Sequence, residues 1–98
     1  MPAYMIGRVD VTDLEKWKEY AAAAGPATDK FGGKYIVRGG AAEGLENYED
    51  EGKRLVVVEF PDMDAARNWY NSPEYQAAKA KREGAGYARF TLVEGFSG

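Results

Sequence analysis

The sequence predicts an α+β fold with a four-stranded antiparallel sheet and helices on one face of that sheet. Three observations support this prediction: the order of strand-like and helix-like segments, the short chain, and an apolar content suited to a packed core. The chain has 98 residues, of which 45% are hydrophobic and 30% are charged, a balance typical of folded domains. We therefore expect a single domain over residues 2–95, with no room for a second hydrophobic core.

The chain begins with a predicted strand and a predicted helix. Residues 3–11 alternate between a mainly apolar set, which includes Met5 and Val9, and a mixed set, as a half-buried strand does. Thr12 and Glu15 have the spacing of a capping box. Aromatic and small residues then recur at helical intervals as far as Phe31, which indicates an amphipathic helix.

Glycine and proline residues divide the next region. Gly25-Pro26 predicts a kink in the helix, because proline has no amide hydrogen to donate to the carbonyl of Ala22. Gly32-Gly33 ends the helix, and residues 34–38 follow as a second strand. The loop from residue 39 to residue 52 lacks the pattern of a calcium-binding loop, so we interpret it as solvated. Its acidic residues are Glu43, Glu46, Glu49, Asp50 and Glu51.

The second half of the chain predicts a strand, a divided helix and a last strand. The β-branched run over residues 54–60 is typical of a central strand, and Asp62 caps the helix that follows. Ser72 and Pro73 supply an N-cap and a first helical position for a further piece that reaches about Glu83. Residues 87–94 alternate as the last strand.

The predicted order βαββαβ corresponds to a ferredoxin-like fold with both helical regions on one face of the sheet. The other face of the sheet then lies open. Open apolar sheet faces are rare on monomers, so we expect a second copy of the chain to cover this one. The sequence therefore predicts a homodimer that packs sheet against sheet.

Strand alternation assigns side chains to the two faces of the sheet. The helix-covered face is expected to carry Met5, Val9, Tyr35, Val37, Val56, Val58, Phe60, Phe90 and Leu92. The open face is expected to carry Tyr4, Ile6, Arg8, Ile36, Arg38, Leu55, Val57, Glu59, Arg89, Thr91 and Val93. The second set mixes aliphatic surface with four charges, and a dimer would enclose those charges.

Three arginines and one glutamate on the expected open face suggest a ligand site. We expect Arg8 to meet Glu59 on adjacent strands, with Arg38 and Arg89 on the outer strands. Unpaired buried cations are costly, and a small organic anion would satisfy them through bidentate hydrogen bonds. The alternative is that these charges only form ion pairs within the dimer and bind no ligand.

Other side chains have simpler interpretations. The aromatic residues Trp17, Tyr20, Trp69, Tyr70 and Tyr75 recur at helical spacing, which usually indicates core rather than pocket. Ser72 precedes Pro73-Glu74, so we interpret its hydroxyl as a helix cap rather than as a nucleophile.

Composition excludes several function classes. The chain contains no cysteine and no histidine, so disulfides, thiolate metal sites, Ser-His pairs and His-ligated haem are excluded. We expect no metal and no cofactor. A net charge of −3 gives no footprint for nucleic acid or anionic lipid. The sequence contains no long apolar segment, so we expect neither a signal peptide nor a membrane span. We therefore expect a cytoplasmic protein.

Several motifs together resemble a known family. These motifs are Pro2-Ala3-Tyr4, residues 33–40, residues 55–61, and the segment that contains Trp69-Tyr70 and Ser72-Pro73-Glu74-Tyr75-Gln76 and ends near Arg82. In this order they resemble the family catalogued as domain of unknown function thirteen-thirty. The resemblance covers the chain from about residue 2 to residue 95 and implies the dimeric α+β barrel superfamily. The matched polar positions are Arg38, Glu59, Ser72, Tyr75 and Arg82.

The resemblance implies a fold without assigning an activity. Superfamily relatives include cofactor-free monooxygenases, haem proteins, muconolactone isomerase-like enzymes and ligand sensors, and whether this chain is an enzyme stays open. Our first hypothesis is a pocket for a small organic anion, lined by Arg8, Arg38, Glu59, Arg89, Tyr75 and Arg82. The alternatives are a noncatalytic structural or regulatory dimer and a cofactor-free monooxygenase or isomerase. To act as a general base, Glu59 would need a raised pKa, and the flanking arginines oppose such a rise. We therefore favour ligand binding over catalysis.

Overall fold

The computed structural model describes residues 1–47 and 53–96. Glu49, Asp50 and Glu51, which we interpreted as part of a solvated loop, lie outside these residues. The elements are β1 (Ala3–Val11), α1 (Leu14–Lys30), β2 (Lys34–Arg38), β3 (Arg54–Phe60), α2 (Met63–Asn71), α3 (Pro73–Lys81) and β4 (Gly86–Glu94). This order confirms the predicted βαββαβ arrangement, with the second helical region divided into α2 and α3.

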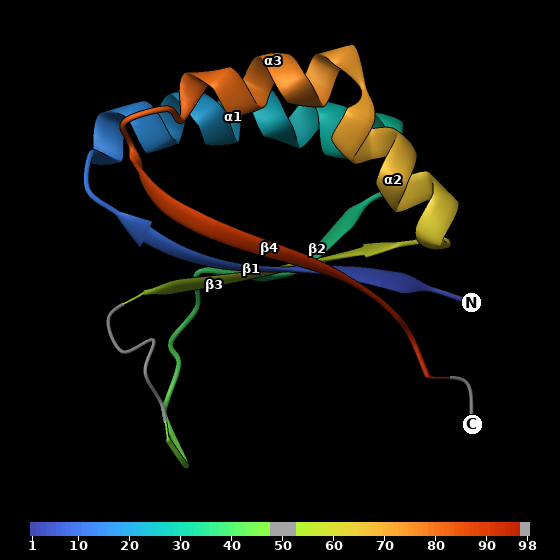
Figure 1. Cartoon of the computed structure of the whole chain (residues 1–98), viewed down its shortest axis with the longest axis horizontal. Helices are drawn as coiled ribbons and strands as arrows, with labels where there is room; N and C mark the ends of the chain where they lie inside the picture. The colour runs from blue at the N-terminus through green and yellow to red at the C-terminus, as the bar shows by residue number, and fades with distance from the viewer. Residues whose placement is uncertain (48–52, 97–98) are drawn as a thin grey trace.

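The four strands form one antiparallel sheet in the order β2-β3-β1-β4. All three helices lie on the same side of this sheet, so the structure has two layers (Figure 1). The predicted ferredoxin-like architecture is therefore confirmed. Among the described residues, no helix combines the length and the apolar character needed to cross a membrane.

Helix α1 begins one residue later than the capping box predicted. Asp13 is the N-cap, and its carboxylate accepts a hydrogen bond from the Lys16 amide at 3.2 Å. The Thr12 amide instead donates to the Ala85 carbonyl at 2.8 Å. The expectation that Thr12 caps this helix is therefore wrong, because the Asp13 carboxylate reaches the amide three residues ahead and Thr12 still belongs to the turn before it.

Helix α1 continues through Pro26 and ends at a Schellman motif. The Gly33 amide donates to the Thr28 carbonyl at 2.9 Å, and the Gly32 amide donates to the Asp29 carbonyl at 3.1 Å. Gly32 has a φ of +78°, a left-handed conformation that glycine adopts without steric cost. The helix therefore stops where Gly32-Gly33 predicted.

The predicted caps of α2 and α3 are confirmed. The Asp62 carboxylate accepts a hydrogen bond from the Ala65 amide at 2.7 Å. The Ser72 hydroxyl accepts from the Tyr75 amide at 3.0 Å, and Pro73 occupies the first position of α3. Ser72 thus starts α3 directly after α2 has ended at Asn71, which turns the chain between the two pieces.

A bulge in β2 corrects the expected faces of Val37 and Arg38. Tyr35 pairs with Val58, but Val37 pairs with Val57 and Arg38 pairs with Val56, so Ile36 is an extra residue. Directly paired residues share a face of the sheet, and a bulge shifts the alternation by one residue. Val37 therefore lies on the open face, and Arg38 lies on the helix-covered face.

The core lies between the helices and the sheet, as the remaining alternation predicted. Its fully buried side chains include Val9, Val58, Phe60 and Tyr75. Trp69 joins the two layers, because its ring lies 5.0 Å from the ring of Phe60 and 4.2 Å from the ring of Tyr75. The expectation that the helical aromatics belong to the core is confirmed for Trp17, Tyr20, Trp69 and Tyr75.

Candidate functional site

A cavity of about 330 Å³ lies between α1 and the sheet. Side chains from α1, from the three strands β1, β2 and β3, and from α2 and β4 line it. Its lining residues are Met5, Leu14, Trp17, Lys18, Tyr20, Ala21, Tyr35, Arg38, Gly39, Arg54, Val56, Val58, Trp69 and Phe90. The cavity therefore combines aromatic walls with three cationic side chains and, among these lining residues, no carboxylate.

The β2 bulge brings Arg38 to this cavity. The Arg38 guanidinium lies over the ring of Tyr35, with 4.5 Å between Cζ and the ring centroid. Such stacking holds a guanidinium in place while leaving its hydrogen-bond donors available at its edge. Arg38 thus has a defined position at the end of β2 where it can bind an anionic group.

Arg54 enters the cavity from the first residue of β3. The Gly39 amide donates to the Leu55 carbonyl at 2.8 Å, and Gly39 has a φ of +70°. A Cβ atom at Gly39 would lie 3.7 Å from Nη1 of Arg54. The turn after β2 therefore places the Gly39 backbone next to the Arg54 guanidinium. Arg38, which precedes Gly39, and Arg54 thus line the same part of the cavity.

The aromatic wall of the cavity is held by buried hydrogen bonds. The Trp69 indole nitrogen donates to the Thr28 hydroxyl at 3.2 Å, and that hydroxyl donates to the Ala24 carbonyl at 2.8 Å. The Tyr35 hydroxyl lies 3.3 Å from the same Thr28 oxygen. Thr28 therefore ties α1 to both β2 and α2 and fixes two of the rings that line the cavity.

A second polar cluster lies behind the cavity wall, between α1 and α3. The hydroxyl oxygens of Tyr20 and Tyr75 are 2.8 Å apart. Arg82 lies against both this pair and the sheet, with its Cζ 5.2 Å from the Tyr20 ring centroid and 5.0 Å from that of Phe90. Burial raises the pKa of Tyr20 and of Tyr75, and the Arg82 charge partly opposes this rise. Both hydroxyls therefore keep their protons at neutral pH.

The structure separates the residues that we expected to form one site. Arg8 and Arg89 lie opposite each other on the open face, whereas Arg38 lies on the other side of the sheet. Tyr75 and Arg82 belong to the cluster behind the cavity wall. The expected enclosed site on the open face therefore keeps only Arg8, Glu59 and Arg89 of the residues proposed for it.

The expected meeting of Arg8 with Glu59 is also wrong. Arg8 pairs with Leu55, whereas Glu59 pairs with Tyr4. Leu55 and Glu59 are four residues apart along β3, which corresponds to roughly 13 Å. Strand adjacency was right, but the register places these two charges at different ends of the sheet. Glu59 instead raises the pKa of the Tyr4 hydroxyl by hydrogen bonding with it.

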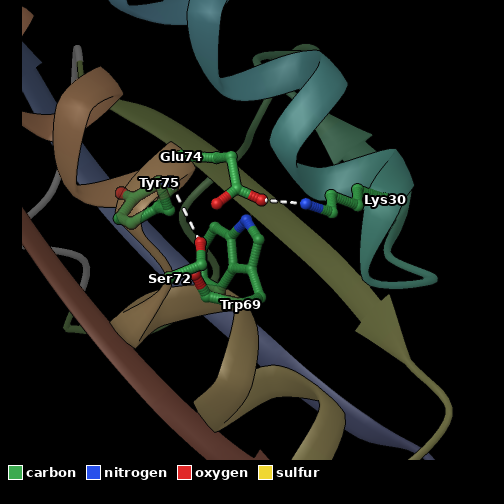
Figure 2. Close-up of polar contacts among 5 residues, drawn as sticks. All are labelled: Lys30, Trp69, Ser72, Glu74 and Tyr75. Atoms are coloured by element: carbon green, nitrogen blue, oxygen red, sulfur yellow. Dashed lines mark hydrogen bonds and ion pairs between the residues drawn. The ribbon is translucent and has the colours of Figure 1, made fainter.

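The Ser72 hydroxyl is fully engaged in backbone capping. It donates to the Trp69 carbonyl at 2.7 Å and accepts from the Tyr75 amide. Figure 2 shows Ser72 between Trp69 and Tyr75, and shows Glu74 turned toward Lys30 of α1. The interpretation of Ser72 and Pro73 as a helix cap is therefore confirmed.

Within residues 1–47 and 53–96, no group of three or more carboxylates is placed to hold a metal ion.

Sequence reasoning missed Lys18, Tyr35 and Arg54 as members of a site. Arg54 alternates in phase with Val56 and Val58, which we placed on the helix-covered face. The alternation of this strand could therefore have placed Arg54 on the helix-covered face as well. Lys18 follows Trp17 on α1 and carried no motif. The cavity itself was not predicted, because aromatic residues at helical spacing do not distinguish a filled core from a lined space.

Comparisons with known proteins give a family and a fold. The model of a family described as domain of unknown function (DUF1330) matches residues 2–96. No curated protein matches the chain. A solved protein of unknown function from Rhodopseudomonas palustris is 21% identical with a TM-score of 0.77, over 99% of this chain and 84% of that one.

Two further solved structures share this fold at lower identity. SnoaB, a cofactor-independent oxygenase from Streptomyces nogalater, is 10% identical with a TM-score of 0.69, over 99% of this chain and 95% of that one. A dimeric protein of unknown function with a ferredoxin-like fold from Bacteroides fragilis is 16% identical with a TM-score of 0.55, over 96% of each chain.

Proposed function

We propose that this chain, which belongs to the DUF1330 family, binds a small aromatic carboxylate or a related organic anion in the cavity between α1 and the sheet. The observation that carries the proposal is the position of Arg38. It stacks on Tyr35 at the edge of an aromatic cavity, close to Arg54. Both arginines present guanidinium donors, which match a carboxylate better than other side chains do.

The walls of the cavity suit a flat apolar body attached to the anionic group. The ring centroids of Trp17 and Tyr20 on α1 are 4.8 Å apart. Trp69 of α2 and Phe90 of β4 complete the aromatic lining of the cavity. Ligand sites of this kind combine mostly apolar walls with a few polar groups that fix orientation. An aromatic ring would pack between these side chains while its carboxylate meets Arg38 and Arg54.

Binding fits the site better than general base catalysis does. The lining residues named above include no carboxylate, and the chain has no histidine, so proton abstraction would fall to a tyrosine or lysine. The fold that this chain shares with SnoaB makes cofactor-independent oxygenation the second candidate function. That candidate requires turnover of an aromatic substrate with oxygen, which an assay of oxygen uptake measures directly.

We also propose that the chain forms a homodimer through the open face of the sheet. Apolar residues on that face are exposed to solvent: the exposed fraction is 48% for Ile36, 40% for Val37 and 43% for Val93. A neighbour with the same fold is dimeric. In this arrangement the anion site lies on the far side of the sheet from the dimer interface, so each subunit carries its own site. A noncatalytic structural dimer remains the alternative if no ligand binds.

Ligand binding is tested by thermal shift and calorimetry with a panel of benzoates on the wild-type protein and on two variants. Arg38→Gln removes the proposed anion contact. Lys81→Gln removes one positive charge from an exposed position at the end of α3 and serves as the matched control. We expect the benzoates to bind the wild type and Lys81→Gln alike and to bind Arg38→Gln much more weakly.

A further inference from the structure

A second cavity, of about 230 Å³, lies between α2 and strands β1 and β4. Ligand pockets in proteins usually have volumes of about 300–1,000 Å³, so this space is small for a site of its own. It shares three lining residues, Met5, Trp69 and Phe90, with the cavity between α1 and the sheet. A single layer of side chains therefore separates the two cavities.

Two of the three shared side chains are held in place. The Trp69 indole nitrogen donates to the Thr28 hydroxyl at 3.2 Å. Phe90 lies directly opposite Gly7 across β4 and β1, and a Cβ atom at Gly7 would be 2.8 Å from Cε1 of Phe90. The absence of a side chain at Gly7 therefore allows the Phe90 ring to lie across the backbone of β1.

Met5 is the shared side chain that can move. A Cβ atom at Gly7 would lie 3.7 Å from the Met5 sulfur, so the thioether lies beside the same glycine as the Phe90 ring. A methionine side chain is unbranched, has three rotatable bonds and adapts to irregular spaces. Rotation of Met5 would join the two cavities without any change in the backbone of the sheet.

The joined space would extend across the sheet from Arg38 to Leu92. Arg38 is on β2, and Leu92 lines the second cavity from β4, directly opposite Met5. The sheet order places β2 and β4 at opposite edges, and a strand spacing of about 4.8 Å puts them roughly 14 Å apart. A single benzoate ring with its carboxylate at Arg38 would therefore leave the second cavity empty.

We infer that the two cavities form one elongated ligand site, with Met5 as a movable divider. This inference rests on the proposed function and narrows its ligand class. The preferred ligand is an aromatic carboxylate with an unbranched apolar substituent opposite the carboxylate. Its carboxylate binds Arg38, and its ring lies in the cavity between α1 and the sheet. Its substituent displaces Met5 and packs against Ala66 and Leu92, which line the second cavity.

A series of benzoates with 4-methyl, 4-ethyl, 4-propyl and 4-butyl substituents tests this inference by calorimetric titration. Burial of each methylene group raises affinity by about fourfold. We therefore expect the wild type to bind 4-butylbenzoate at least about tenfold more tightly than 4-methylbenzoate. This affinity ratio is measured within each protein, so a change in stability alone does not alter it.

Variants at the second cavity and at the divider locate the substituent. Leu92→Phe adds bulk to the second cavity and should lower the ratio to about one. Leu45→Phe is the matched control, because Leu45 is 87% exposed and belongs to neither lining; it should keep the wild-type ratio. Met5→Ile introduces a branched, stiffer side chain and should lower the ratio, whereas Met5→Ala removes the divider and should retain or raise it.

The outcomes distinguish this inference from the proposed function. Benzoates that bind the wild type and are weakened by Arg38→Gln, but gain nothing with substituent length, would overturn the elongated site and leave the anion site standing. A wild-type ratio in Leu92→Phe would also overturn the elongated site, because the substituent would then lie elsewhere. A wild-type ratio in Met5→Ile would overturn the role of Met5. Failure of every probe to bind the wild type would overturn both sites together.

Discussion

Arg38 lies directly opposite Val56 across strands β2 and β3, on the face of the sheet that the helices cover. One extra residue, Ile36, produces this relationship by shifting the alternation of β2 between Tyr35 and Val37. The same bulge turns Val37 to the open face. Adjacent residues of one strand therefore contribute to two different surfaces, the cavity between α1 and the sheet and the proposed dimer interface.

This division predicts opposite effects for substitutions at neighbouring positions. Val37→Lys places a charge in the proposed dimer interface and should raise the dissociation constant of the dimer by at least about tenfold. Arg38→Gln should leave that constant unchanged. Sedimentation equilibrium over a concentration series measures both values. A Val37→Lys protein that remains as dimeric as the wild type would contradict the assignment of the open face as the interface.

Thr28 should contribute to stability through its hydroxyl group. Thr28→Val removes the acceptor of the Trp69 indole nitrogen and leaves a buried donor unpaired, which costs about 1–3 kcal/mol. Denaturant unfolding of the wild type and the variant gives this difference in the free energy of unfolding. Thr28→Ser keeps the hydroxyl and should lose less stability than Thr28→Val. An equal decrease in the free energy of unfolding in the two variants would show that packing rather than hydrogen bonding dominates at this position.

Removal of the Ser72 cap should destabilise the start of α3. Ser72→Ala loses the acceptor of the Tyr75 amide, and the loss of an N-cap costs about 1 kcal/mol. Chemical unfolding measures this change, and Ser72→Thr, which retains a capping hydroxyl, should recover part of it. An Ala variant as stable as the wild type would mean that Pro73 and the packing of Tyr75 define this turn without the cap.

The ion pair between Lys30 and Glu74 should make stability depend on pH. The hydrogen bond from Lys30 lowers the pKa of the Glu74 carboxyl below its ordinary value of 4.5. The folded state therefore holds this proton less readily than the unfolded state, so the stabilising effect is present above the ordinary pKa and is lost as the pH falls below it.

Thermal unfolding of the wild type and of Glu74→Gln over a pH series measures this effect. The wild type should have the higher melting temperature at neutral pH, and the difference should shrink as the pH falls below 4.5. Lys30→Gln should show the same convergence. A difference that stays constant with pH would indicate that Glu74 acts through packing and not through its charge.

The elements of the fold could be predicted because local signals agreed with one another. Asp62 and the Ser72-Pro73 pair have the chemistry that begins helices, and Gly32 has the conformational freedom that ends one. The segment from residue 54 to residue 60, with three consecutive valines at its centre, identified a central strand. These signals act over a few residues, so a single sequence contains them in full.

The site was only partly predictable because it depends on register and on the β2 bulge. No local residue pattern marks Ile36 as the extra residue, and without it Arg38 is assigned to the wrong face. The pairing of Arg8 with Leu55 rather than with Glu59 is likewise set by the alignment of whole strands. The aromatic residues were correctly expected to be buried, but the space between them depends on how α1 packs over the sheet.

Calorimetric titration of a benzoate panel into the wild type, Arg38→Gln and Lys81→Gln tests the central claim most directly. A ligand at about 100 times its dissociation constant adds about 2.7 kcal/mol of stability, so thermal shifts provide a parallel readout. We predict binding to the wild type and to Lys81→Gln, with affinity for Arg38→Gln lower by at least about tenfold. The absence of binding across the panel, or equal affinity in all three proteins, would contradict an anion site at Arg38.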